Sequence, residues 1–213
     1  MKKKKRDAQK TKQKLLDTAE IVFVKKGYDG ARVDEIANEA GVNKRMIYVF
    51  FGSKELLYVE VLRNSFTRLF HADRPEPNNE ADPIEQVENV VRWYFWFLSE
   101  NPNFVRLFGW ETLHDGSRAG KVLFDLMGEG LGPLQTIVKR GKKMGCFHND
   151  LAVHKVITII NEMCLGFFSR MSLFEVLWQR DLEDRREQSL MLDHILMVLR
   201  DGLCTESRQV SDA

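Results

Sequence analysis

The chain has 213 residues, 44% of them hydrophobic and 30% charged, which suits one medium domain or a small domain followed by a larger one. No apolar run approaches the roughly 20 residues that span a bilayer, and together with the charge content this argues against a membrane protein. The net charge of +1 hides an asymmetry, because residues 1–60 hold 14 Lys and Arg against 9 Asp and Glu, whereas the remainder holds 18 against 22.

The basic N-terminal part is therefore where a polyanion such as nucleic acid would bind. An equally weighted alternative is that the lysines after Met1 only aid solubility. The three cysteines, Cys146, Cys164 and Cys204, are an odd number at wide spacing and predict no disulfide framework. No apolar segment follows the basic start, so we expect no export and a cytoplasmic protein.

In chain order, residues 1–10 are expected to form a disordered basic arm. A helix is predicted from about Asp7 to Lys26, and Gly27 is expected to end it. The apolar stripe of this helix recurs at i, i+1, i+4, i+7 and i+8 and consists of Leu15, Leu16, Ala19, Val22 and Phe23.

Residues 33–51 predict two short helices that meet at Gly41. Ile36, Ala37 and Ala40 share one face of the first helix. Gly41 is the residue best able to take the left-handed conformation of the turn that follows.

In the second short helix, Asn43 has the side chain to act as the N-cap, and Ile47 and Phe51 share an inward face. Three residues lie on the opposite side with no carboxylate among them: Lys44, Arg45 and Tyr48. A short helix with an apolar back and a cationic front fits the major groove of DNA, so this stretch predicts a helix-turn-helix.

Ser53 is expected to cap a fourth helix that reaches about Phe70. Its apolar side should consist of Leu56, Leu57, Leu62 and Phe66. Residues 71–82 contain two prolines and two asparagines, so we predict a linker and a domain boundary there.

Asp82 and Pro83 are expected to start a helix, as an N-cap residue followed by proline at the first helical position. We expect this helix to be central, because its segment Trp93–Phe97 is apolar on nearly every side. Asn101–Pro102 should separate it from the next helix. Ser117 should begin a further helix, with interruptions at Gly128, Gly130, Gly132 and Pro133.

Asp150 is expected to cap a long apolar helix, and a last helix is predicted over about residues 183–203. No stretch alternates between apolar and polar residues with period two. The sequence therefore predicts an all-α fold with eight to ten helices.

Three segments together resemble the DNA-binding domain of the TetR family of transcriptional regulators: a helix ending in Lys25-Lys26-Gly27, the run Ile36–Val42 and the run Ile47–Leu57. The resemblance covers roughly residues 10–60, and spacing and residue type agree across several elements. The segment from Asn101 to Leu113 is also similar to the ligand-binding domains of some members.

The resemblance implies a homodimer in which an N-terminal three-helix helix-turn-helix domain precedes a helical ligand-binding and dimerisation domain. Small molecules typically bind the second domain and change the spacing of the two recognition helices. We therefore expect a DNA-binding domain at 11–57 with a connecting helix to about 70, the linker 71–82, an effector-binding and dimerisation domain at 83–205, and a disordered tail at 206–213.

Position by position, the resemblance places five residues at the recognition-helix sites: Asn43, Lys44, Arg45, Met46 and Tyr48. Arg32 and Val33 start the supporting helix, and Lys54 starts the fourth helix, where the family touches phosphate. Arg45 and Met46 are bulkier than usual, Arg32 stands where a capping Thr or Ser is common, and Phe50 replaces a usual Tyr or His. The operator is therefore not expected to match those of relatives.

Arg45 is the best candidate for reading a base, since a guanidinium can bridge O6 and N7 of guanine, and contact with phosphate alone is an equally weighted alternative. Four residues are expected to grip the phosphate backbone: Lys44, Tyr48, Lys54 and Thr11. If a dimer neutralises about 6–10 phosphates, the affinity should fall by about 10³–10⁵ between 50 and 200 mM salt.

An effector pocket should be apolar with a few polar groups. The apolar candidates are Trp93, Phe97, Phe108, Trp110, Met163, Phe167 and Phe168, and the polar candidates are Glu111, His114 and Asn161. So many aromatic residues favour a hydrophobic or planar effector. The alternative, that aromatic residues at helical spacing simply fill a core, has more weight for any single residue.

Cys146, His148 and His154 lack the paired spacing of a zinc site, so we predict neither a metal nor a cofactor. Cys164 on an apolar helix face is expected to be a small buried hydrophobic residue. No Gly-rich phosphate loop, H-E-x-x-H or G-x-S-x-G is present, so no enzyme is predicted.

The last two long helices carry apolar stripes that could pair across a two-fold axis as a four-helix bundle, or only close the core of the monomer. We favour the dimer, because two half-sites need two DNA-reading domains. The leading hypothesis is thus a ligand-responsive repressor that binds a palindromic double-stranded DNA operator and is released by a small-molecule effector, although the sequence does not distinguish repression from activation. The alternatives are a DNA-binding regulator without an effector and a metal-dependent or enzymatic helical protein.

Overall fold

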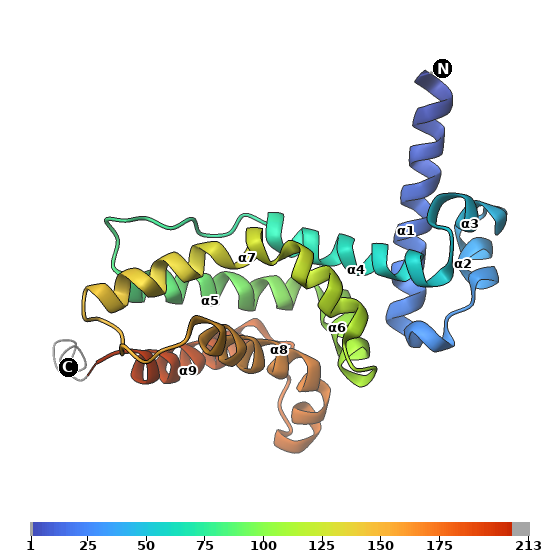
Figure 1. Ribbon diagram of the computed structural model, residues 1–213. Helices are drawn as coiled ribbons and strands as arrows, with labels where there is room; N and C mark the ends of the chain where they lie inside the picture. Colours follow the sequence, from blue (N-terminus) through green and yellow to red (C-terminus); the bar gives the residue numbers. More distant parts are fainter. Residues whose placement is uncertain (1, 206–213) are drawn as a thin grey trace. The chain divides into compact units, whose positions relative to one another are not determined.

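The computed structural model describes residues 2–205, apart from the side chains of residues 2–5 and 127–131. Within this part the chain is helical, with one isolated bridge between Phe147 and Cys204, and the predicted all-α fold is confirmed. Figure 1 shows the helices, which are α1 (Lys2–Gly30), α2 (Val33–Ala40), α3 (Arg45–Phe51), α4 (Lys54–His71), α5 (Pro83–Glu100), α6 (Pro102–Leu113), α7 (Ser117–Lys143), α8 (Val153–Trp178) and α9 (Arg185–Leu203).

The helices form two compact units. The N-terminal unit comprises the chain up to Phe70 together with Asn103–Leu126. The C-terminal unit comprises His71–Pro102 together with the residues from Met127 onward. This grouping of the chain differs from the domains at 11–57 and 83–205 that we expected from the sequence.

Helix α6 belongs to the N-terminal unit because its apolar side is buried there. Phe104 and Leu107 are 3% and 1% exposed. Phe66 of α4 lies edge-on to Phe104, with the ring centroids 5.4 Å apart, and also to Phe108, at 6.2 Å. Aromatic contacts of this geometry add to the stabilisation that burial alone gives.

Helix α1 starts earlier than we predicted. Residues 1–10 were expected to be disordered, but α1 begins at Lys2. No glycine or proline occurs between Lys2 and Lys26, and Lys, Arg, Gln and Ala are strong helix formers. Residue 1 and the tail expected at 206–213 lie outside the described residues. The five core positions predicted for this helix are all buried.

Gly27 ends the regular part of α1, as predicted, and one further helical turn follows. Its φ of 67° lies in the left-handed region. A Cβ at Gly27 would lie 2.9 Å from Cε3 of Trp110 in α6, whose indole N–H donates a hydrogen bond to the Val24 carbonyl at 3.1 Å. Glycine is therefore needed here both for the backbone conformation and for the close approach of Trp110.

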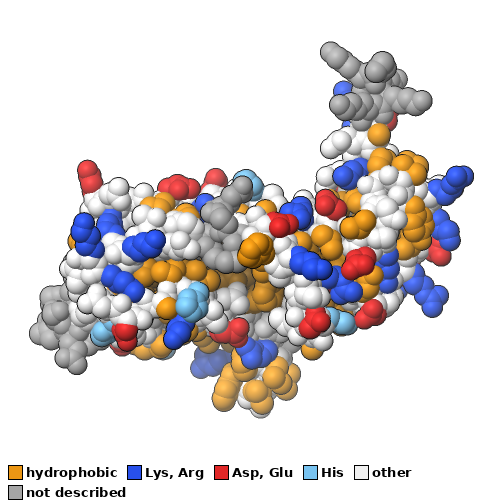
Figure 2. Space-filling view, viewed as in Figure 1, with side chains coloured by type: hydrophobic (Ala, Val, Ile, Leu, Met, Phe, Trp, Pro, Cys, Tyr) orange, Lys and Arg blue, Asp and Glu red, His pale blue; other side chains and the backbone are white. Residues whose placement is uncertain are grey.

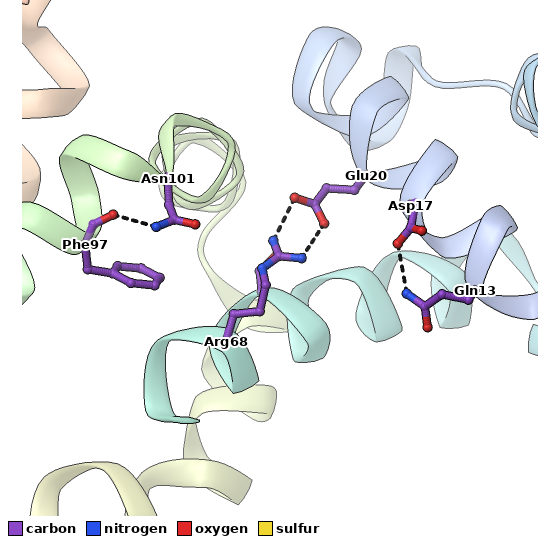
Figure 3. A network of polar contacts seen from close by, with 7 residues as sticks. Gln13, Asp17, Glu20, Arg68, Phe97 and Asn101 are labelled. Carbon is purple, nitrogen blue, oxygen red and sulfur yellow. Dashed lines mark hydrogen bonds and ion pairs between the residues drawn. The ribbon is translucent and has the colours of Figure 1, made fainter. Parts of the chain in front are cut away.

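An ion pair joins α1 to α4. The Arg68 guanidinium donates two hydrogen bonds to the Glu20 carboxylate, at 2.9 and 2.7 Å (Figure 3). It donates a third to the Ser65 hydroxyl at 3.2 Å. Glu20 is 8% exposed, so its charge would be costly without a partner. The two parallel hydrogen bonds provide that partner in a geometry specific to arginine.

In the C-terminal unit, α5 packs against α8 and α9. Phe95 of α5 is fully buried, and the rings of Phe167 and Phe168 lie 5.9 and 4.8 Å from its ring. Trp93 and Trp96 on the same helix are only half-buried. The predicted central helix thus faces the core on one side and not all round.

The segment predicted as a linker is held by hydrogen bonds within the C-terminal unit. The Asn78 N–H donates to Oε1 of Gln86 at 2.8 Å, and the Gln86 side-chain amide donates to the Ala81 carbonyl at 3.0 Å. Arg140 of α7 donates to the carbonyls of Asn78 and Ala81. Residues 78–82 are therefore fixed to the unit and do not form a free tether.

Helix α7 is continuous, whereas we predicted a break. It runs from Ser117 to Lys143 with Pro133 inside it. Proline removes one helical hydrogen bond. The residues after it, Leu134, Ile137 and Val138, are buried, and their packing offsets this loss.

Two further local predictions were wrong. Asp150 is exposed, and α8 begins after Ala152 without a side-chain cap. Leu56 is 54% exposed, because the inward face of α4 is set by Leu57 and Val61, one helical turn apart.

Helix α8 is long and apolar enough to cross a membrane by length and composition, with a mean hydropathy of 1.3, contrary to our reading of the sequence. The core helix of a soluble protein meets the same criteria. In this chain α8 packs on α5 and α9 and buries Val156, Ile160 and Cys164, and 33% of its apolar window is buried.

Replacing Gly27 with Ala should lower the free energy of unfolding by about 2–4 kcal/mol, because an L residue is strained at this φ and its Cβ would overlap Trp110. Chemical denaturation measures the change. Gly120→Ala is the matched control: Gly120 is helical, exposed and free of neighbours around its Cβ position, so alanine should stabilise the protein by up to about 1 kcal/mol. Equal effects of the two substitutions would contradict the role given to Gly27.

Candidate nucleic-acid interface

The turn between α2 and α3 is closed by Gly41, as predicted. Its φ and ψ are 65° and 36°, and its N–H donates to the Asn38 carbonyl at 3.0 Å. The Val42 N–H donates to the Ala37 carbonyl, also at 3.0 Å. This pair of hydrogen bonds is the Schellman pattern that ends a helix, and it fixes the direction in which the chain leaves α2.

Asn43 lies two residues before Arg45, the first residue of α3, and its side chain caps the start of the helix. Its side-chain oxygen accepts a hydrogen bond from the Arg45 N–H at 2.9 Å, and its carbonyl accepts one from the Met46 N–H at 2.8 Å. The cap satisfies a backbone donor that would otherwise have no partner in the helix. The predicted role of Asn43 as an N-cap is confirmed.

The two faces of α3 differ as the sequence predicted. Ile47 and Phe51 are 0% and 6% exposed and hold the helix against the unit. Arg45 is exposed and Tyr48 is 50% exposed on the opposite side. Figure 2 shows Lys and Arg side chains on the outer side of the α2–α3 pair. A cationic surface free of core contacts is thus available to a partner.

Lys44 has a carboxylate partner that the sequence analysis did not foresee. Its Nζ lies 2.8 Å from Oδ1 of Asp34 in α2, and both side chains are more than half exposed. The hydrogen bond with Asp34 raises the pKa of Lys44. Contact between Lys44 and a phosphate would therefore compete with this ion pair.

The supporting helix starts as expected. Arg32 occupies the N-cap position of α2 with extended backbone and makes no side-chain cap hydrogen bond. Its side chain is exposed, and Val33, the first residue of α2, is half-buried. Arg32 therefore adds a positive charge at this end of α2 but leaves the cap unfilled.

Thr11 and Lys54 already have partners within the unit. The Thr11 hydroxyl donates to the Asp7 carbonyl at 2.9 Å. Nζ of Lys54 lies 4.6 Å from the centroid of the Tyr28 ring, and the Arg118 guanidinium lies 4.1 Å from the same centroid. Burial lowers the pKa of Lys54. Both residues are half-buried.

Val49 was not among the predicted residues. It is 71% exposed and lies four residues after Arg45, so the two share one side of α3. An apolar side chain on a groove-facing helix can contact the methyl group of thymine. The helical spacing from Arg45 was the signal in the sequence that could have identified it.

The ten residues expected to line an effector pocket are divided between the two units, and four belong to the N-terminal unit: Phe108, Trp110, Glu111 and His114. Glu111 is 2% exposed, and its carboxylate accepts a hydrogen bond from the Ala119 N–H at 2.9 Å. The His114 ring lies 2.9 Å from the Trp110 carbonyl oxygen, a contact that raises its pKa, and 3.0 Å from the Asp29 carboxylate. These side chains therefore join α6 to the end of α1 and the start of α7.

The other six belong to the C-terminal unit: Trp93, Phe97, Asn161, Met163, Phe167 and Phe168. Asn161 accepts a hydrogen bond from the Tyr94 hydroxyl at 2.8 Å, and burial raises the pKa of Tyr94. The Trp93 and Phe97 rings are 6.2 Å apart. These residues connect α5 with α8.

A small pocket in the C-terminal unit is lined by none of these ten residues. Its walls come from α5, α9 and the segment before α8, and include Ile84, Val87, Phe147, Leu196 and Leu203. Its space corresponds to about one water molecule, so it is too small for an effector.

No group of three His, Cys, Asp or Glu side chains is placed to hold a metal ion in the part of the chain that the structure describes. Of the residues considered for zinc, Cys146 is buried, whereas His154 is exposed. Burial raises the pKa of Cys164 to about 12, so this thiol is neutral at physiological pH. Such a thiol behaves as the small hydrophobic residue that we predicted.

Comparisons with known proteins agree with this geometry. The family "Bacterial regulatory proteins, tetR family" matches residues 15–61, and the family "Tetracyclin repressor-like, C-terminal domain" matches residues 83–198. The HTH-type transcriptional repressor NicS of Pseudomonas putida is 30% identical over 198 residues, covering 92% of this chain and 93% of NicS. The HTH-type transcriptional activator FasR of Mycolicibacterium smegmatis is 36% identical over 93 residues, covering 44% of this chain and 42% of FasR.

Among solved structures, the fatty acid degradation regulator FadR from Bacillus halodurans has a TM-score of 0.66 at 19% identity, covering 88% of this chain and 93% of FadR. This likeness shows the same fold. The matches cover both the helix-turn-helix and the helices after it, in the order that the family has them. The chain belongs to the TetR family of bacterial transcriptional regulators.

Proposed function

We propose that this regulator is a cytoplasmic, ligand-responsive repressor that binds a near-palindromic DNA operator as a homodimer and is released by a small hydrophobic or planar effector. The observation that carries the proposal is the outer face of α3, where Arg45 and Tyr48 are exposed while Ile47 and Phe51 anchor the helix. Repression is favoured over activation because the relative that matches nearly the whole chain is a repressor, whereas the activator matches less than half of it.

Arg45 is the residue best placed to read a base. Lys44 beside it is paired with Asp34, whereas Arg45 has no carboxylate partner among the described residues. A guanidinium that is exposed and unpaired can form the two parallel hydrogen bonds with O6 and N7 of guanine. Lys44, Tyr48 and Lys54 would then hold the phosphates that fix the register.

The proposed dimer uses α8 and α9. Besides its buried stripe, α9 exposes Leu190, Met191, Met197 and Val198 along one side. Four further apolar residues are exposed at the C-terminal end of α8, where Figure 2 shows hydrophobic side chains grouped together: Leu173, Val176, Leu177 and Trp178. Apolar surfaces of this kind on two neighbouring helices suit a four-helix interface with a second copy.

A regulator without an effector is the second candidate. It is favoured by the contacts that nine of the ten candidate pocket residues make within their own units, and by the small size of the described pocket. Calorimetry with panels of apolar, planar and charged small molecules separates the two. Binding of an apolar or planar compound that also lowers operator affinity supports the first, whereas no binding by any compound supports the second.

Replacing Arg45 with Ala should weaken operator binding and lose about 1–3 kcal/mol of discrimination at one base pair of each half-site, because the two hydrogen bonds to guanine are removed. Fluorescence anisotropy with an operator selected from random DNA measures the affinity. The same operator with 7-deazaguanine at that position lacks N7 and should weaken wild type but not the variant. A uniform loss for all sequences would assign Arg45 to phosphate contact instead.

Replacing Asp34 with Asn should strengthen DNA binding several-fold at low salt. The substitution releases Lys44 from its ion pair and removes a negative charge near the duplex. The gain should shrink as salt is raised, because exposed charges are screened. Asp34→Asn in a Lys44→Ala background should give a smaller gain, and equal gains in both backgrounds would exclude the ion pair as the cause.

Replacing Met197 with Glu should dissociate the dimer, because α9 would then bring two like charges together in an apolar interface. Light scattering coupled to size-exclusion chromatography measures the oligomeric state. Asn89→Glu adds the same charge at an exposed position of α5 and should leave the dimer intact. A dimer that tolerates both substitutions would place the interface elsewhere.

A further inference from the structure

Residues 2–14 of helix α1 extend beyond the hydrophobic core that the rest of the helix covers. Its first buried side chain among those described is Leu15, so residues 2–14 add about 20 Å of helix at 1.5 Å per residue. Figure 1 shows this part of α1 continuing past α2 and α3. The length corresponds to roughly six base pairs of duplex DNA, at 3.4 Å per base pair.

This extension is strongly basic, and three of its charges are regularly spaced. Residues 2–14 contain eight Lys and Arg and one acidic residue, Asp7. Arg6, Lys10 and Lys14 follow one another at intervals of four, which places them along one side of the helix, and all three are exposed. No carboxylate is paired with them in the described part of the chain.

The spacing has a physical cost. Like charges four residues apart destabilise a helix. Solubility alone would be served equally well by charges distributed over the whole surface. A bound polyanion removes the repulsion between Arg6, Lys10 and Lys14, so the arrangement favours a partner with a row of negative charges.

The basic side of α1 is continuous with the helix-turn-helix. A Cβ placed at Gly41, the turn before α3, would lie 3.7 Å from Nζ of Lys14. On the neighbouring side of α1, Nζ of Lys12 lies 5.5 Å from the centroid of the Phe51 ring at the end of α3. Lys14 therefore marks the point where the charged side of α1 meets the DNA-reading element.

We propose that residues 2–14 of α1 form a second DNA-contacting surface, in which Arg6, Lys10 and Lys14 bind phosphates of the duplex next to the site that α3 occupies. This inference rests on the proposed operator binding and extends it to flanking DNA. Phosphates carry no sequence information, so the surface raises affinity and salt dependence without changing the preferred sequence. An anionic membrane suits the segment less well, because Ala8 is the only apolar residue in it.

The triple variant Arg6→Gln, Lys10→Gln, Lys14→Gln tests the proposal, because glutamine removes the charge and keeps a high helix propensity. The control, Lys139→Gln, Lys143→Gln, Lys155→Gln, makes the same change of net charge at exposed positions of the C-terminal unit. Both are titrated with a selected operator that carries long flanks, over a range of salt concentrations. For a dimer, the slope of log K against log salt should decrease in magnitude by about 2–5 in the triple variant and stay at the wild-type value in the control.

The length of the duplex provides the second measurement. Trimming both flanks to the base pairs contacted by α3 should bring the affinity of the wild type down to that of the triple variant, while the triple variant itself should be little affected. Far-ultraviolet circular dichroism checks that the triple variant keeps its helical content. A variant with lower helicity is replaced by the pair Arg6→Gln, Lys10→Gln, which should show a smaller decrease in slope of the same sign.

The outcomes separate this inference from the proposed function. A wild-type slope in the variant on the long duplex would overturn the inference and leave operator binding intact. A difference that persists unchanged on the trimmed duplex would also overturn it, because the three charges would then act inside the α3 site. If the wild type selects no duplex at all, the proposed operator binding fails and the inference fails with it.

Discussion

The proposed DNA-reading surface depends on the burial of two side chains. Helix α3 has only seven residues, and isolated helices shorter than about 12–15 residues are marginal in water. Ile47 and Phe51 fix it to the N-terminal unit, and the cap from Asn43 satisfies a backbone donor at its start. Since the anchoring residues face inward, the outward residues Arg45 and Tyr48 are exposed and available to a partner.

Helix α6 is held within the N-terminal unit by contacts along much of its length. Trp110 fits against Gly27 and bonds to Val24, and His114 contacts Asp29 at the end of α1. Glu111 accepts a hydrogen bond from Ala119 at the start of α7. These contacts tie α6 to the end of α1 and to the first residues of α7.

The sequence predicted the helix-turn-helix well because its signals are local. Gly41 and Asn43 act on backbone groups only two to four residues away, and the periodicity of Ile47 and Phe51 identifies the buried face. The partner of Lys44 escaped prediction because Asp34 lies in the preceding helix, across the turn.

More distant relationships were not accessible from the sequence. Trp110 meets Gly27 across more than eighty residues of chain, and no periodicity reports such a contact. The aromatic residues of the effector prediction were recognised as apolar, but nothing in their spacing showed that they divide between two units. The continuity of α7 through Pro133 likewise depends on the burial of Leu134 and Ile137, which is a property of the fold.

The chain passes between the two units more than once, and this limits where it can be cut into fragments. It changes unit after Phe70, after Pro102 and after Leu126. A fragment that stops at Phe70 would carry the whole helix-turn-helix, yet it would uncover Phe66 and leave the ring of Trp110 missing from its place against Gly27. Exchange of the N-terminal unit of this chain therefore has to carry α6 and residues 117–126 of α7 along with the first four helices.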